Sequence, residues 1–438
     1  MNKVLIITYY WPPASGPGVQ RFLKICKYLR MFEWEPIVLT VRNGSYPSFD
    51  ETLIHDIPDN LSVYKTQTCE PFTLFNKFSG KKGRDSSVGF INMNQKKSLF
   101  QRIAFFIRAN FFIPDARIGW KSFALRQAYR IIKKEQIDAV ITTGPPHSTH
   151  LIGHKLKYKF HLPWIADFRD PWTTVYYNEI FPRTKFTEKL DYHLESKVLR
   201  ESDLVTVVSH GLKEEYMGRA QRLEIIYNGY DEEDVIHSAT EKSNIFTLSY
   251  IGNLKPNQNI TMLWEALNEL KKEINHFSQL FRLRFIGNID NQILEDVNHN
   301  NLQDITETKS FVPHREATKL MSASNMLLFI VPFVTNNRLI ITGKLFEYIA
   351  SQTPILSIGP TGGNAAKILS ESGRDDMITY DDKEQCKQLI KQYFQEWIKI
   401  EYQLKKHSNQ NIEKYSRRYL TKLLSNYLNQ LNYEYQKN

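Results

Sequence analysis

The stretch Thr342-Gly343-Lys344-Leu345-Phe346-Glu347-Tyr348-Ile349-Ala350-Ser351 predicts a helix that opens on a glycine and carries a lysine and a glutamate one turn apart. The first amides of a helix have no partner within it, and the positive end of the helix dipole attracts anions. Lys344 adds a mobile positive charge, and Glu347 can accept hydrogen bonds from a ribose diol. We therefore expect Gly343, Lys344 and Glu347 to bind a nucleotide diphosphate.

Short apolar runs alternate with helical patterns on both sides of this stretch. Runs of this kind are typical of parallel strands that are buried on both faces, and their alternation with helices indicates a doubly wound sheet. The runs are Val4–Ile7, Pro36–Val41, Ala139–Thr142, Trp164–Ala166 and Leu204–Val208, then Thr247–Ile251, Leu283–Ile286, Met326–Val331 and Ile355–Ile358. The two series predict an α/β chain with two Rossmann-like domains in tandem, residues 1–210 and 211–411.

Length and composition agree with two globular domains. The 438 residues exceed one ordinary core, and 42% of them are hydrophobic. The three cysteines, Cys26, Cys69 and Cys386, have no metal-ligand spacing, so we expect free thiols in a reducing cytoplasm. No apolar run reaches the length of a transmembrane helix, and no signal-like segment begins the chain.

The net charge of +10 comes from an excess of Lys and Arg in the first half of the chain. A one-sided positive field attracts nucleic acid, an anionic membrane or a polyanionic substrate. Residues 96–112 interleave cations with large apolar residues at helical spacing, as interfacial helices do. An ordinary packed helix with exposed basic residues explains the same pattern, and the sequence leaves both interpretations open.

Three further motifs occur one after another along the chain. The first strand runs into a loop with Gly16 and Gly18, the segment Ala166-Asp167-Phe168-Arg169-Asp170-Pro171-Trp172 follows a middle strand, and Tyr250-Ile251-Gly252-Asn253-Leu254 begins the second series. Together with the 342–351 stretch they resemble the GT-B glycosyltransferases, in particular the large retaining family four. The resemblance covers nearly the whole chain.

The resemblance implies two Rossmann-like domains facing a cleft, with a final helix at about 412–438 that crosses back to the N-terminal domain. It implies that residues 1–210 bind the acceptor and residues 211–411 the nucleotide-sugar donor. The implied reaction transfers a sugar from a nucleotide-diphosphate sugar to a hydroxyl of a glycan or polyprenyl-linked acceptor, with retention, in surface polysaccharide biosynthesis. We expect a cytoplasmic protein, peripheral on the inner face of an anionic membrane, with no nucleic-acid partner.

No cofactor or metal is expected, because no D-x-D triplet occurs in the chain. Helix amides and Lys344 would instead stabilise the leaving diphosphate. On the resemblance, the donor-binding residues are Gly16, Gly18, Gly252, Asn253, Lys255, Gly343, Lys344 and Glu347.

Two positions depart from the family pattern. Leu339 stands where the first glutamate of the family's E-x7-E motif is expected, so the sugar hydroxyls must be recognised by other groups, such as backbone amides at 340–342. Asn253 follows Gly252 where many members have an arginine, and we expect Lys344 to supply that charge.

Candidate acceptor and catalytic residues follow two strands of the first domain. The segment 142–150 places His147 and His150 at the carboxyl edge of the sheet, where ligands bind in such folds. We predict His147, Asp167 and Lys344 as catalytic, with Arg169 and His150 at the acceptor. The histidines can instead be loop or cap residues, and Asp167 and Arg169 can instead belong to a purely structural network. His314 and Arg315 align with a loop near the nucleobase.

Other functions remain as alternatives. A nucleotide-sugar epimerase uses the same fold, and Leu339 favours a non-catalytic sugar-binding protein. The first glycine loop lacks the third glycine of a dinucleotide fingerprint, and neither a P-loop nor a metalloprotease helix occurs. A nucleic-acid-binding module is not recognisable either.

Overall fold

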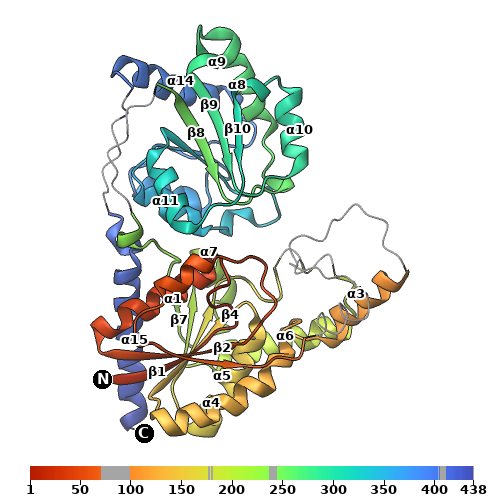
Figure 1. Ribbon diagram of the computed structural model, residues 1–438. Helices are drawn as coiled ribbons and strands as arrows, with labels where there is room; N and C mark the ends of the chain where they lie inside the picture. The colour runs from red at the N-terminus through yellow and green to blue at the C-terminus, as the bar shows by residue number, and fades with distance from the viewer. Residues whose placement is uncertain are drawn as a thin grey trace. The chain divides into compact units, whose positions relative to one another are not determined.

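The computed structural model describes residues 1–70, 99–175, 178, 181–235, 244–402, 404 and 411–437. The chain forms two compact units, one of Met1–Asn228 with Arg417–Asn438 and one of Gly229–Ser416 (Figure 1). The sequence places the boundary at residue 210. The first unit extends to Asn228 instead, because α7 (His210–Tyr216) leads into a last strand, β7 (Leu223–Ile225), that completes the first sheet.

The first unit contains a parallel seven-stranded sheet in the order β3-β2-β1-β4-β5-β6-β7. Its remaining strands are β1 (Asn2–Ile7), β2 (Trp34–Val41), β3 (Ser62–Thr66), β4 (Ala139–Gly144), β5 (Trp164–Phe168) and β6 (Leu204–Val207). The four apolar residues Val4 to Ile7 have no exposed surface, as strands covered on both faces require. Because the chain order reverses between β1 and β4, their carboxyl ends form a topological switch point, where ligands bind in such sheets.

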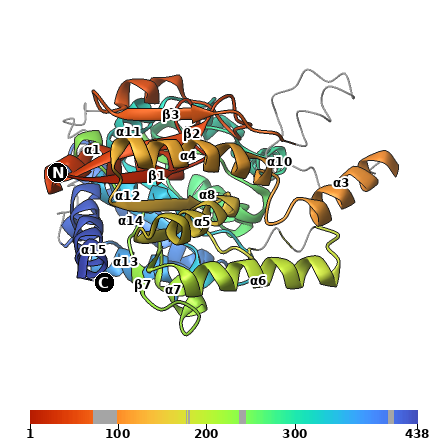
Figure 2. The same cartoon turned by 90° about the horizontal axis from the view of Figure 1, so that it is seen from below.

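Helices of the first unit flank this sheet. They are α1 (Pro17–Leu29), α3 (Leu99–Phe111), α4 (Lys121–Glu135), α5 (His150–Phe160), α6 (Lys185–Glu201), α7 and α15 (Arg417–Lys437). The last of them, α15, lies beside α1 in both views (Figure 1, Figure 2). Its leucines 420, 424, 428 and 431 recur at helical spacing and are buried in the first core. The C-terminal helix therefore completes the N-terminal unit.

The second unit contains a smaller parallel sheet in the order β10-β9-β8-β11-β12, with its own hydrophobic core. The strands are β8 (Phe246–Ile251), β9 (Phe281–Ile286), β10 (Thr306–Lys309), β11 (Met326–Ile330) and β12 (Ile355–Ile358). The helices are α8 (Thr261–Glu273), α9 (Phe277–Leu280), α10 (Asn291–His299), α11 (His314–Ala323), α12 (Gly343–Ala350), α13 (Asn364–Glu371) and α14 (Lys383–Lys399). The prediction of two doubly wound α/β sheets is confirmed.

Helix α3 extends outward beside the start of α6 (Figure 2). Phe105 stacks on Phe181 with ring centroids 5.0 Å apart, and the Asn110 side chain accepts hydrogen bonds from the Thr184 amide and the Thr187 hydroxyl, both at 2.8 Å. One side of α3 is thus packed. The other side exposes apolar side chains, Ile103, Phe106, Ile107 and Phe111. Residues 96–98 of the predicted basic helix lie outside the described residues.

Within the described residues, none of the helices is both long enough and apolar enough to cross a bilayer.

Candidate functional site

The carboxyl edge of the second sheet carries two glycine turns that touch each other. Gly252 follows β8 and Gly287 follows β9, with φ angles of 122° and 124°. This backbone conformation favours glycine. A Cβ atom at Gly287 would lie 2.5 Å from the carbonyl oxygen of Gly252, so the two turns approach closely because neither has a side chain.

Lys344 reaches back to the first of these turns. Its Nζ donates a hydrogen bond of 2.8 Å to Tyr250 Oη and lies 4.2 Å from the centre of the Tyr250 ring, a cation–π arrangement. A Cβ atom at Gly252 would be 2.5 Å from that Nζ. The fold therefore joins Lys344 with Gly252, and the backbone of Asn253 joins them through a 2.8 Å hydrogen bond from Tyr250 Oη.

The sequence did not identify Tyr250 as part of the site. Its place at the head of the Tyr250–Leu254 motif is the signal that could have found it, since it orients the predicted lysine.

The start of α12 has a polar group available beside these turns. Thr342 occupies the N-cap position without a side-chain capping bond, and its Oγ1 is buried with no hydrogen-bond partner. Gly343 is the first helical residue, so no side chain beyond Cα covers the amides there. A helix start of this kind favours an anion. Lys255 lies at the N-cap of the short helix η8 (Pro256–Gln258), after the β8 turn.

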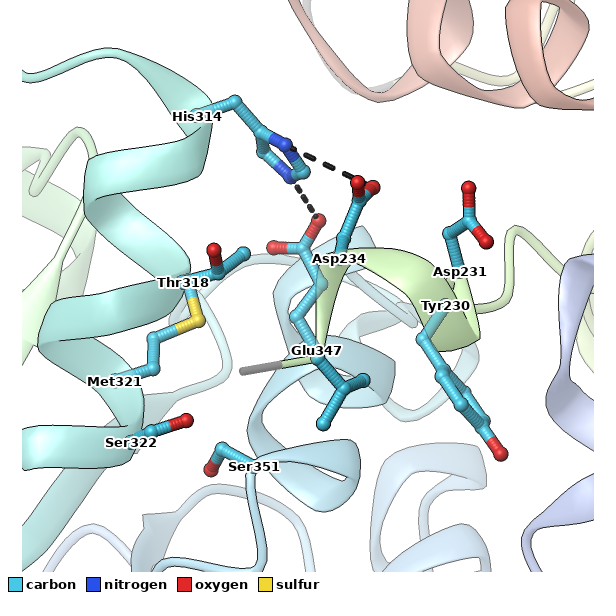
Figure 3. A pocket seen from close by; sticks show the side chains of 10 residues that line it. Tyr230, Asp231, Asp234, His314, Thr318, Met321, Ser322, Glu347 and Ser351 are labelled. Atoms are coloured by element: carbon cyan, nitrogen blue, oxygen red, sulfur yellow. Dashed lines mark hydrogen bonds and ion pairs between the residues drawn. The ribbon is translucent and has the colours of Figure 1, made fainter. Parts of the chain in front are cut away.

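Glu347 points to a different set of partners. His314 Nε2 lies 3.0 Å from Glu347 Oε1, and His314 Nδ1 lies 3.9 Å from Asp234 Oδ2 (Figure 3). These groups line a small pocket of about 20 Å³ with Tyr230, Asp231, Val235, Thr318, Met321, Ser322 and Ser351. The structure thus brings His314, a residue the sequence ranked low, directly onto the predicted ribose-binding carboxylate. Leu339 ends the short helix η10 (Asn337–Leu339) and is half-buried.

In the first unit, Asp167 at the end of β5 is fully engaged by its own unit. Its carboxylate accepts hydrogen bonds from Arg21 Nη2 at 2.7 Å, Thr206 Oγ1 at 2.8 Å and Thr143 Oγ1 at 2.9 Å. Arg21 and Asp167 are both about 2% exposed, and Arg21 Nη1 also donates to the carbonyl of Tyr227 at 2.5 Å. The geometry makes Asp167 the anchor that ties α1 to the ends of three strands.

Arg169 fills the space above Gly18. A Cβ atom at Gly18 would be 1.4 Å from Arg169 Nη1, while nothing lies within 4 Å of one at Gly16. Arg169 Nη2 donates to the Pro145 carbonyl at 2.5 Å and its Nε to Thr143 Oγ1 at 3.1 Å. Gly18 therefore admits a guanidinium group of its own unit.

His147 and His150 are buried among aromatic rings. His147 stacks on Trp172 at 5.0 Å, and His150 stacks on Phe168 at 4.5 Å and shares a 2.9 Å hydrogen bond with Thr142 Oγ1. Burial is the main cause that lowers the pKa of His147 well below its usual value and that of His150 to about 3. Both imidazoles are therefore neutral near pH 7.

A cavity of about 140 Å³ opens where the loops after β1, β4 and β5 meet the end of α3. Its lining includes Tyr10, Phe112, Asp115, Ala116, Arg117, Pro145, Pro146, His147, Trp172, Val175 and Arg183. His147 is the predicted catalytic residue that reaches this cavity; Asp167, Arg169 and His150 are not in its lining. Across the described residues, no group of His, Cys, Asp and Glu has the arrangement of a metal site.

Comparison with known proteins finds similarity to glycosyltransferases. Residues 88–248 match the model of Glycosyltransferase Family 4. The chain has the GT-B glycosyltransferase fold. The resemblance predicted from the motifs is therefore confirmed. A search of the curated proteins gives no match.

Solved structures share the GT-B fold over the full length of the chain. Sucrose-phosphate synthase from Thermosynechococcus elongatus is 12% identical, with a TM-score of 0.58, over 100% of this chain and 98% of that one. WaaG, a glycosyltransferase involved in lipopolysaccharide biosynthesis, is 12% identical with a TM-score of 0.56, over 97% and 99%. A putative UDP-N-acetylglucosamine 2-epimerase from Listeria monocytogenes is 10% identical with a TM-score of 0.56, over 96% and 94%. At these identities the likeness concerns the fold alone.

Proposed function

We propose that the protein is a retaining glycosyltransferase that moves a sugar from a nucleotide-diphosphate sugar to a hydroxyl of a glycan or lipid-linked acceptor. The observation that carries the proposal is the meeting of Lys344, Gly252 and the start of α12 at the carboxyl edge of the second sheet. An ammonium group, side-chain-free turns and helix amides are the groups that a diphosphate requires.

The proposed chemistry is stabilisation of the leaving group without a metal. As the glycosidic bond to the diphosphate breaks, negative charge grows on the phosphate oxygens, and Lys344 with the α12 amides neutralises that charge. Tyr250 holds Lys344 in place through its hydroxyl group and its ring. The Glu347 carboxylate accepts hydrogen bonds from the ribose hydroxyls once its present hydrogen bond with His314 is broken.

The direct test is a panel of UDP, GDP, ADP and dTDP sugars. We expect one nucleotide to raise the melting temperature of the full chain, because a ligand that binds the native state stabilises it. We also expect slow release of the nucleoside diphosphate from its sugar. A panel without any shift in melting temperature rejects the proposal, intact nucleotide sugars with a clear shift indicate a binding protein, and release of an epimerised sugar indicates the epimerase.

We further propose that the enzyme works at the cytoplasmic face of an anionic membrane, in the synthesis of a surface polysaccharide. The side chains of Ile103, Phe106, Ile107 and Phe111 are 43–73% exposed on α3. Helix α3 contains Arg102 and Arg108 and no acidic residue, and the first turns of α6, which begins beside it (Figure 2), carry Lys185, Glu188 and Lys189. Apolar side chains bordered by cations are typical of surfaces that enter the headgroup region of anionic lipids.

Vesicle sedimentation tests the membrane contact. The full chain should bind phosphatidylcholine vesicles that contain phosphatidylglycerol more tightly than pure phosphatidylcholine, and Phe106→Ser with Ile107→Ser should weaken binding at least tenfold. Met31→Ser is the matched control, because Met31 is 53% exposed on the same unit in the short helix Arg30–Phe32 and not on α3. Equal binding by the double variant and the control contradicts the proposal.

A further inference from the structure

His314 lies between two carboxylates in the small pocket of the second unit (Figure 3). It is the first residue of α11, while Glu347 comes from α12 and Asp234 from a short helix near the start of the unit. The side chains of His314, Glu347 and Asp234 are 15%, 19% and 13% exposed, so water reaches them only in part. Three separate segments thus meet around one imidazole ring.

The ring is bonded to one carboxylate and faces the other. His314 Nε2 lies 3.0 Å from Glu347 Oε1, which is a hydrogen-bond distance, whereas its Nδ1 lies 3.9 Å from Asp234 Oδ2. An imidazole can donate through either nitrogen. A movement of the ring by about 1 Å toward Asp234 therefore replaces one hydrogen bond to a carboxylate by another.

The pocket has no room for a sugar beside this ring. Its volume of about 20 Å³ accommodates little more than one water molecule. A ribose that reaches Glu347 must therefore displace the imidazole. His314 occupies the carboxylate that the nucleotide needs.

The charges of the pocket lining favour this exchange. The acidic side chains of the lining are Asp231, Asp234 and Glu347, and His314 supplies its basic group. Asp231 Oδ1 already accepts a hydrogen bond from the Glu233 amide at 3.2 Å. Asp234 is therefore the carboxylate placed to receive the imidazole, and the displaced ring stays beside a negative charge.

We propose that His314 competes with the ribose for Glu347, and that Asp234 accepts the imidazole when the nucleotide binds. His314 then sets the affinity for the nucleotide by acting through Glu347. This inference rests on the proposed function, because it concerns how the ribose hydroxyls reach that carboxylate. With two carboxylates around one imidazole, the chain exchanges a hydrogen bond instead of losing one.

Titration calorimetry of the full chain with UDP, GDP, ADP and dTDP tests the competition. The nucleotide that binds the wild type should bind His314→Ala about five to ten times more tightly, because Glu347 no longer has a partner to give up. His314→Gln keeps an N–H donor of similar reach and should bind like the wild type.

His299→Ala is the matched control in the same unit. His299 also lies near a carboxylate, 4.0 Å from that of Asp296, but its side chain is 80% exposed and does not line the pocket. The control should bind the nucleotide with unchanged affinity.

Double variants separate competition from a structural effect of the substitution. In a Glu347→Ala background, His314→Ala should leave the affinity unchanged, because the carboxylate for which the two groups compete is absent. Asp234→Ala should weaken binding about threefold when His314 is present and have no effect in His314→Ala.

The proposal is overturned if His314→Ala binds no more tightly than the wild type, or if its gain persists in the Glu347→Ala background. Either result leaves the proposed function standing, since a nucleotide binds. If neither the wild type nor His314→Ala binds any of the four nucleotides, the proposed function fails and this inference fails with it. Should His314→Ala not fold, Asp234→Ala decides, and unchanged or tighter binding by that variant overturns the proposal.

Discussion

The two parallel sheets have the same strand order around their centres, yet different side chains lie at their carboxyl edges. In the first unit the charged groups at this edge are paired internally, as in the contacts of Asp167 with Arg21 and of Arg169 with Pro145. In the second unit the edge consists of two bare glycine turns, a helix start and Lys344 resting on Tyr250. The difference teaches that the same strand order can end in charged groups that pair within the unit or in glycine turns and a helix start, which are the groups that the proposed diphosphate site requires.

The largest effect is expected from a substitution that breaks the internal pairing of the first unit. Asp167→Ala leaves Arg21 buried without its carboxylate, and removal of one partner of a buried pair costs about 3–5 kcal/mol of unfolding free energy. Urea unfolding followed by tryptophan fluorescence measures the loss. Asp59→Ala, at an exposed position of the same unit, should change the unfolding free energy by less than about 0.5 kcal/mol. Equal values for the two variants would show that Asp167 is not an anchor.

Lys344→Ala removes the cation of the second edge with little effect on the fold, because Lys344 is only half-buried. We expect the affinity for the nucleoside diphosphate to fall about tenfold to a hundredfold, or about 1.4–2.8 kcal/mol. Titration calorimetry with the nucleotide that raises the melting temperature measures it. Lys319→Ala is the control, since Lys319 is exposed on α11. If Lys344→Ala bound the nucleoside diphosphate as tightly as the wild type, the proposed diphosphate site would be contradicted.

Gly252→Ala tests the bare turn itself. The added Cβ would meet Lys344 Nζ at 2.5 Å, and a φ of 122° strains any residue with a side chain. The lysine tip can move aside, so we expect the nucleotide affinity to fall about threefold to tenfold. Gly362→Ala, where nothing lies within 4 Å and φ is not in the strained range, should bind like the wild type.

The smallest effect concerns the buried imidazoles of the first edge. The pKa of His150 is about 3 in the folded protein and near 6.5 when unfolded, so the unfolded chain binds the proton more readily and stability falls as the pH drops below about 6.5. His150→Gln lacks this group, so only the wild type loses unfolding free energy through it. The difference in unfolding free energy between wild type and His150→Gln should therefore shrink by about 1 kcal/mol between about pH 6.5 and pH 5.5. Urea unfolding at both pH values measures the change.

A difference between wild type and His150→Gln that is constant with pH would mean that the ring is not shielded from protonation in the folded state.

The sequence predicted the strands of the two sheets unevenly, for a physical reason. The central strands are covered on both faces and read as apolar runs. The three strands that the sequence missed, β3, β7 and β10, all lie at sheet edges and carry charged or polar residues, as in Thr306-Glu307-Thr308-Lys309. These three strands are only partly covered, so burial does not impose an apolar pattern on them. The edge strand β12 is fully buried and does show an apolar run.

The candidate site was predictable where a local motif carries it. Gly343, Lys344 and Gly252 were predicted because helix starts and glycine turns have local signatures, and the structure places Lys344 against Gly252. The links of Lys344 to Tyr250 and of Glu347 to His314 join residues 94 and 33 positions apart, which no local pattern encodes. Gly18 was predicted to make room for a diphosphate, whereas its space holds Arg169, a contact that depends on where two distant loops meet.

The return of α15 to the first core makes the second unit an insertion rather than an appended half. Residues 229–416 are continuous and can be excised as one segment, whereas the first unit can be isolated only as a fusion of residues 1–228 to 417–438. A circular permutant that opens the chain within the inserted segment and joins the original ends would keep the first hydrophobic core in one covalent piece. Truncation after residue 411, by contrast, removes a buried leucine stripe and leaves Trp34 Nε1 without its partner Asn429.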